Sequence, residues 1–148
     1  MEKQERGGNI SIDNYIDNFN YSKNNDEVEG AYICDVSSFL QLYELEKRRI
    51  TREWLSIFLV HLILFTGNNI FNNNKNFNNY FKIILKNQLR AGDVVCNCDN
   101  NHFVIMLTDI KRKDVRRVIN RIEKSFRTTY GRENKVEIKS SYYKVSGL

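Results

Sequence analysis

The amino-acid sequence predicts an α/β (α+β) domain in which helices pack on one mixed sheet, in the order α-β-α-β-β-α-β. Three segments place apolar residues at the 3.6-residue spacing of an amphipathic helix, and four segments are apolar runs or alternate as strands do. A single strand, a helix, a hairpin, a helix and a strand form the ferredoxin-like split βαβ order. The chain has 148 residues, of which 41% are hydrophobic, and this length fits one domain.

Residues 1–29 are expected to form a linker or N-terminal arm, and residues 30–148 to form the folded domain. The first segment is polar with few sizeable apolar side chains, which is typical of linkers. From Asp35 to Glu53 the apolar residues share one face and predict a helix. Ser38 followed by Gln41 predicts a capping box near its start.

The most apolar run, Trp54 to Thr66, predicts a long central strand that is covered on both faces. It has no helical period and is rich in β-branched and aromatic residues. It is too short for a membrane helix. The next segment, Phe77 to Leu89, has clear helical spacing, and Gly92 is expected to end that helix.

Two short strands, Asp93–Cys98 and His102–Thr108, are predicted to form a hairpin. The turn between them consists of residues that tolerate the positive φ of a tight turn, namely Asp99, Asn100 and Asn101. A strongly basic helix is predicted from Lys113 to Phe126. The alternation of apolar residues from Val136 to Tyr142 predicts the last strand.

The segment from Arg90 to Leu107 resembles the core of a GGDEF domain, the diguanylate cyclase family. That family has an Arg-x-x-Asp pair, a short strand, a Gly-Gly-Asp-Glu-Phe turn and an apolar strand. The pair is kept here as Arg90 and Asp93. The five positions of the signature turn are occupied by Asp99, Asn100, Asn101, His102 and Phe103. Only the phenylalanine is kept, so the chain resembles a degenerate GGDEF-like domain with a nucleotidyl-cyclase-like fold.

A narrower resemblance involves the segment from Gly30 to Arg49. It is similar to the start of the degenerate GGDEF-like region that closes some bacterial regulators built around a bacterial transcriptional activator domain (BTAD). The resemblance implies DNA-binding and activator parts upstream of Met1. It also implies a non-catalytic regulatory or protein-interaction domain of a bacterial transcriptional or signalling regulator, with a protein partner or self-association as a homodimer.

Diguanylate cyclases, as the resemblance implies, condense two GTP molecules with the help of divalent metal. Their metal-binding aspartate ends the first strand, where Thr66 or a near neighbour stands here. Mg²⁺ prefers hard oxygen ligands such as carboxylates, but Asn101 and His102 are not anions. The segment from Thr66 to Phe77 is also too short for the family's base-reading segment. We therefore predict no catalytic residue, no metal, no cofactor and no cyclase activity.

Arg90 and Asp93 leave a second function open, which is sensing of cyclic di-GMP. The resemblance places them at the offset of the family's inhibitory product site, and a guanidinium binds phosphate or a guanine edge through two hydrogen bonds. The alternative interpretation is structural. Arg90 would close a helix end and Asp93 would fix the entry of a strand.

The basic helix suggests a more distant alternative, a nucleic-acid-binding module. A net charge of +5 and a pI near 9.1 permit a polyanion partner. However, the hairpin strands lack the exposed aromatic pairs on which bases stack. A solvated helix face is the simpler interpretation.

The three cysteines, Cys34, Cys96 and Cys98, together with the absence of a secretory leader, predict reduced thiols in a cytoplasmic protein with no membrane segment. Cys96 and Cys98 lie near His102, but their spacing is not that of a usual zinc site. Strand alternation favours packing for both thiols instead. His61 is interpreted as a core histidine because it lies in the middle of the apolar run.

Overall fold

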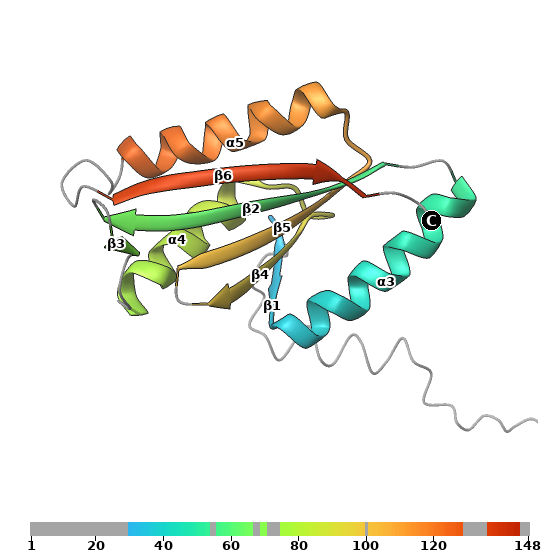
Figure 1. Ribbon diagram of the computed structural model, residues 1–148, viewed down its shortest axis with the longest axis horizontal. Helices are drawn as coiled ribbons and strands as arrows, with labels where there is room; N and C mark the ends of the chain where they lie inside the picture. Colours follow the sequence, from blue (N-terminus) through green and yellow to red (C-terminus); the bar gives the residue numbers. More distant parts are fainter. Residues whose placement is uncertain are drawn as a thin grey trace, which may run out of the picture.

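The computed structural model describes residues 30–53, 56–66, 69–70, 75–99, 101–128 and 136–145. The expected arm, residues 1–29, and the turn residue Asn100 lie outside the described residues. Within the described part, one six-stranded sheet carries α3 on one face and α4 and α5 on the other (Figure 1). This arrangement confirms the predicted mixed α+β fold.

The elements follow the predicted order, with two short strands added to it. In chain order they are β1 (Tyr32–Cys34), α3 (Val36–Glu53), β2 (Ile57–Thr66), β3 (Asn69–Ile70), α4 (Lys75–Gln88), β4 (Val94–Asp99), β5 (His102–Thr108), α5 (Arg112–Phe126) and β6 (Val136–Lys144). β1 is parallel to β4, whereas the other pairs are antiparallel. The sequence did not predict β1 and β3, because runs of three and two residues are too short to show a period.

β2 is an inner strand of the sheet and the longest described strand, at 10 residues. It pairs with β5 on one side and with β6 on the other. Phe58, Val60, Leu62 and Leu64 enter the core under α4 and α5. Ile57 and Leu59 enter the core under α3. The strand was predicted to be covered on both faces, and this is wrong for its second half. There His61, Ile63 and Phe65 stay half-buried, because α3 covers only the start of the strand.

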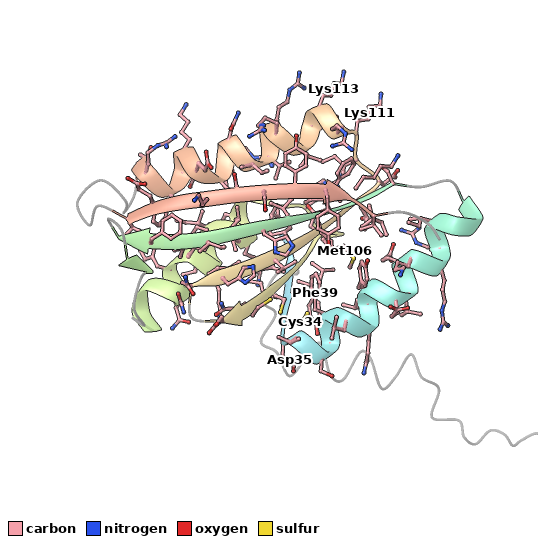
Figure 2. The ribbon with its side chains drawn as sticks, in the orientation of Figure 1. Cys34, Asp35, Phe39, Met106, Lys111 and Lys113 are labelled. Atoms are coloured by element: carbon pink, nitrogen blue, oxygen red, sulfur yellow. The ribbon has the colours of Figure 1, made fainter. Side chains whose placement is uncertain are left out.

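The larger core lies between the sheet and the helices α4 and α5. It is joined by buried side chains from β2, β4, β5 and both helices. A smaller core lies under α3, where Phe39 packs toward Met106 of β5 (Figure 2). Burial of these apolar faces is the main force that holds the helices on the sheet.

α3 begins one residue later than predicted, and its cap is not the predicted one. The Ser38 backbone N–H donates to Oδ1 of Asp35 at 2.7 Å, so Asp35 is the N-terminal cap. This hydrogen bond lowers the pKa of Asp35. The expected capping box of Ser38 and Gln41 is wrong because Asp35, the residue just before the helix, already accepts from the Ser38 N–H.

Gly30 lets β1 lie close to α4. Its φ is +81°, and a Cβ there would lie 2.0 Å from the Lys86 carbonyl oxygen. Only glycine adopts this conformation without strain and leaves that space open. The close approach of β1 to α4 therefore requires a glycine at this position.

The boundaries of the other helices differ from the predictions by one or two residues. α4 begins two residues earlier than predicted and ends one residue earlier, and α5 begins one residue earlier. No helix among the described residues is long and apolar enough to cross a membrane.

Candidate functional site

The turn between β4 and β5 is built on polar side chains instead of glycines. The strand register shifts between Asn97 and Asp99. The Asn97 side-chain amide donates to the Asp99 carbonyl and, at 3.2 Å, to the His102 carbonyl. This amide therefore closes the turn from inside the hairpin, while Asp99 is exposed.

Asn101 connects the turn to the end of β2. It is only 8% exposed, and its Nδ2 donates to the Leu64 carbonyl at 3.3 Å. The Leu64 N–H donates in turn to the Asn101 carbonyl at 2.9 Å. The side chain at this position thus satisfies a backbone group of the sheet.

His102 faces the open side of the sheet and meets His61. Nδ1 of His61 and Nε2 of His102 lie 3.1 Å apart, so one ring donates and the other accepts. Burial and the neighbouring His102 both lower the pKa of His61. Tyr143 of β6 stacks on the other side of His61, with ring centroids 6.0 Å apart. His61 is therefore half-buried in a row of rings and is not the core histidine that was predicted.

Near the strand end where the resemblance implies a metal ligand, the described side chains include an aromatic ring and, from the neighbouring strand β6, a cation. Strand alternation places Phe65 on the face of His61 and His102. The Nζ of Lys139 lies 5.6 Å from the centroid of the Phe65 ring. Glu137 is opposite Phe65 on β6 and, among the described residues, is the one carboxylate on this face at that register. The side chain of Thr66 lies outside what the structure describes.

These residues do not fit the divalent metal that a cyclase would use. Mg²⁺ needs several oxygen ligands and is usually held by one or two carboxylates plus phosphates, whereas Lys139 places a positive charge beside the single Glu137. No group of three or more His, Cys, Asp and Glu suited to a metal occurs in the described ranges. Sequence reasoning missed Lys139 and Phe65 because their proximity depends on the register of β2 with β6, which no local pattern gives.

Phe103, the retained signature residue, is fully buried in the larger core. Its ring meets Phe81 of α4 edge-on, with centroids 4.9 Å apart. Phe81 in turn contacts Phe126 of α5. Packing in the core therefore explains the phenylalanine at position 103.

Arg90 and Asp93 are brought together at the turn that leads from α4 into β4. The Arg90 backbone N–H donates to Asp93 Oδ2 at 2.8 Å, and its Nη2 donates to Asp93 Oδ1 at 3.1 Å and to the Thr108 carbonyl at 2.7 Å. The Asp93 side chain is 2% exposed, but that of Arg90 is 55% exposed. The carboxylate is occupied within the fold, and the guanidinium still has a surface that faces solvent.

The three thiols lie on the α3 side of the sheet in different environments. Cys96 is buried and Cys98 is exposed, with their sulfurs 3.5 Å apart. Burial and the neighbouring Cys98 raise the pKa of Cys96 to about 12. Burial also raises the pKa of Cys34. The raised pKa values of Cys34 and Cys96 do not suit a nucleophile. The packing that was predicted for Cys98 is wrong, because this thiol is exposed.

α5 uses several of its cations within the fold. The Arg112 and Arg116 guanidinium groups lie 5.2 and 5.4 Å from the ring centroids of Phe58 and Tyr142. Arg121 binds Gln88 of α4. Lys111 and Lys113 point away from the sheet at the start of the helix (Figure 2). Nucleic-acid binding by this face stays the more distant alternative to a solvated helix face.

A hollow of about 320 Å³ lies between the end of α5 and the start of β6. Its lining includes Glu123, Glu137 and Arg127 beside apolar side chains. Strand alternation turns the Glu137 side chain to the opposite face of the sheet. The hollow therefore has one carboxylate, that of Glu123, against the Arg127 guanidinium, and this pair gives no excess of positive charge for a triphosphate.

The fold described above also occurs in proteins of known structure. No family model and no curated protein sequence matches the chain. Solved structures do match. The chain has the fold of a GGDEF domain.

Three solved structures illustrate this GGDEF-like fold. A diguanylate cyclase (DGC) protein of Thermotoga maritima superposes with a TM-score of 0.63 at 16% identity, over 79% of this chain and 83% of that chain. Diguanylate cyclase SiaD of Pseudomonas aeruginosa, in complex with its activator SiaC, gives 0.65 at 16% identity, over 96% and 60%. The GGDEF domain of DgcB from Caulobacter crescentus, in complex with c-di-GMP, gives 0.61 at 10% identity, over 82% and 77%.

Proposed function

We propose that this GGDEF-like chain is a non-catalytic regulatory or protein-interaction domain. The observation that carries the proposal is the Lys139 ammonium over the Phe65 ring, 5.6 Å from its centroid, next to the strand end where the resemblance implies a metal ligand. Transfer of a phosphoryl group depends on positioning and on neutralisation of charge by metal ions. A lysine beside one carboxylate does not provide a metal site.

The signature turn supports the same proposal. Asp99 and Asn100 replace the two glycines and place side chains where a nucleotide would approach the backbone. Asn101 is engaged with Leu64, and His102 with His61. The four altered positions of the motif thus consist of an exposed acid, an asparagine outside the described residues and two side chains with partners within the fold.

We further propose that the domain belongs to a bacterial transcriptional or signalling regulator. The BTAD-like resemblance of Gly30 to Arg49 supports DNA-binding and activator parts upstream. A GGDEF-like fold in complex with a protein activator, as in the SiaD structure, supports a protein partner. The reading frame upstream of Met1 tests this context, and the absence of a DNA-binding domain there would contradict it.

A cyclase assay tests the loss of catalysis directly. Purified protein with GTP and either Mg²⁺ or Mn²⁺ should form no cyclic di-GMP, while an active diguanylate cyclase treated in parallel should form it. Turnover above a no-protein control would overturn the proposal.

A second candidate function is the sensing of cyclic di-GMP by Arg90 and Asp93. The observation in its favour is that the pair is assembled and that the guanidinium is still 55% exposed. Against it, both carboxylate oxygens of Asp93 already accept hydrogen bonds from Arg90. The sensor is therefore the secondary proposal.

Calorimetry with cyclic di-GMP distinguishes the two candidates. If the sensor exists, Arg90→Ala should weaken binding about tenfold or more, because a charged hydrogen bond contributes about 1.5–3 kcal/mol. Arg117→Ala is the matched control, since Arg117 forms the same i,i+3 ion pair with Asp114 on an exposed helix. Binding that survives Arg90→Ala but not Arg117→Ala would place the ligand on α5, and no binding at high micromolar ligand would remove the sensor.

A further inference from the structure

β6 is a long strand at the edge of the sheet. It has nine residues and pairs with β2 alone in the part of the chain that is described. The opposite edge is β1, which has only three residues. An unpaired edge of nine residues is a template for another strand.

The hydrogen bonds of the sheet show which groups of β6 are free. The Val145 N–H donates to the Ile57 carbonyl at 2.9 Å, so this pair is hydrogen-bonded. In an antiparallel ladder such pairs alternate with non-bonded ones. The odd-numbered residues of β6 therefore direct their backbone groups toward β2. On the other side of β2, the Leu64 N–H donates to Asn101, which agrees with this alternation.

The even-numbered residues direct their N–H and C=O groups to the open edge. They are Val136, Ile138, Ser140, Tyr142 and Lys144. These five residues are symmetric about Ser140. A second copy of β6, related by a two-fold axis at Ser140, would give hydrogen-bond partners to the backbone groups of all five residues.

We propose that β6 pairs in antiparallel fashion with β6 of a second copy of this chain, with Ser140 opposite Ser140 of that copy. Ile138 then lies opposite Tyr142, and Val136 lies opposite Lys144. The two sheets continue into one another across a two-fold axis, as closed dimers require. This proposal rests on the proposed function as a protein-interaction domain. The dimer would be one interaction that the domain makes, and β6 would be the surface that it uses.

The charges on the strand favour this register over its neighbours. With the axis at Ser140, Lys139 faces Ser141 and Glu137 faces Tyr143, so that no like charges are opposed. An axis at Lys139 would place two lysines opposite each other, which destabilises a strand pair. An axis at Ser141 would leave Val136 without a partner on the strand.

The first test is the mass of the full-length protein in sedimentation at tens of micromolar. We expect a dimer in the wild type and in Ser140→Ala, which keeps the backbone groups. Ser140→Pro removes an N–H that β2 does not use, so the fold should persist in circular dichroism. Loss of two central hydrogen bonds should weaken the dimer at least about tenfold. A wild-type monomer at these concentrations would overturn the proposal.

The second test fixes the register by cross-linking and does not depend on the proline variant. In a Cys98→Ser background, Ser140→Cys places two thiols on residues whose Cα atoms lie about 5.5 Å apart, within the range of a disulfide. Lys144→Cys is the control, because the two thiols would lie eight residues apart along the ladder, about 27 Å.

Copper phenanthroline oxidation should give a covalent dimer with Ser140→Cys and none above background with Lys144→Cys. Equal cross-linking of both variants, or none with either, would overturn the register. The cyclase assay measures a separate quantity, so a failure of this dimer and a failure of the proposed function remain distinguishable.

Discussion

Cys96 and Cys98 are neighbours that the structure places in opposite environments. Cys96 is fully buried, whereas Cys98 is exposed. A thiol reacts as its thiolate, and the pKa of Cys96 is raised to about 12. Cys98 is therefore accessible to solvent, whereas the Cys96 thiol stays protonated at neutral pH.

We predict that Cys98 reacts with Ellman's reagent at pH 8 in the folded protein and that Cys96 reacts only after denaturation. Cys98→Ser should remove the fast phase, and Cys96→Ser should leave it unchanged. Equal reaction rates for the two thiols would contradict the burial of Cys96.

We also predict that His61 contributes to the dependence of stability on pH. Its pKa is lowered in the folded state from 6.5, so the unfolded chain binds the proton more tightly. Stability from this group is present above pH 6.5 and falls as the pH drops from there through the lowered folded value. Thermal melts at pH 7.5 and 5.5 should show a smaller decrease for His61→Gln than for the wild type, and an unchanged decrease would contradict this role.

β1 depends on one backbone conformation at its start. Gly30 has a φ of +81° and no room for a Cβ beside Lys86. At Gly92 the nearest atom to such a Cβ is 4.0 Å away. The two glycines thus provide a matched pair in which one position is sterically closed and the other is open.

Gly30→Ala should destabilise the protein by at least about 1 kcal/mol, because alanine is strained at positive φ and would meet a backbone carbonyl. Gly92→Ala should change stability by less than about 0.5 kcal/mol. Urea denaturation measures both values. Equal midpoints for the two variants would show that β1 does not need Gly30.

Elements in which apolar residues recur with a strong period could be predicted from the sequence. Elements that are fixed by contacts with distant parts of the chain could not. α4 and α5 were placed within two residues because each buries one regular apolar face. β1 carries no such pattern in its three residues, and it is defined by Asp93 and the parallel register with β4. The cap at Asp35 was missed because two nearby residues matched a known cap sequence.

Across the whole molecule, one ring of the signature turn joins the hairpin to two helices. Phe103 contacts Phe81, and Phe81 contacts Phe126. This chain of rings links β5, α4 and α5 in the larger core. The contribution of Phe103 to stability thus explains why this phenylalanine is retained, and no role in catalysis is needed.

Phe103→Ala should lower the free energy of unfolding by about 3–5 kcal/mol, a large part of the 5–15 kcal/mol typical of a domain. Tyr143→Ala is the control, because Tyr143 is 50% exposed and should cost less than about 1 kcal/mol. If urea denaturation gave similar losses of unfolding free energy for Phe103→Ala and Tyr143→Ala, the central position of Phe103 in the core would be contradicted.

The candidate site was predictable in its residue types and not in its geometry. The loss of glycines and carboxylates is visible in the sequence around Asp99 to His102. The contact of Lys139 with Phe65 joins residues 74 positions apart, and it exists only because β2 and β6 pair in one register. The open half of the sheet was missed because a buried strand and a half-covered strand share the same apolar composition.

The unequal sizes of the two cores bear on the motions of the domain. Eighteen buried residues form the core under α4 and α5, and eight form the core under α3, counted among the described residues. Amide hydrogens exchange through partial opening of the least stable unit. α3 should therefore detach while the rest of the sheet stays folded, and its amides should exchange with deuterium before those of α5. Each such opening would transiently uncover Met106 and the thiols beside it.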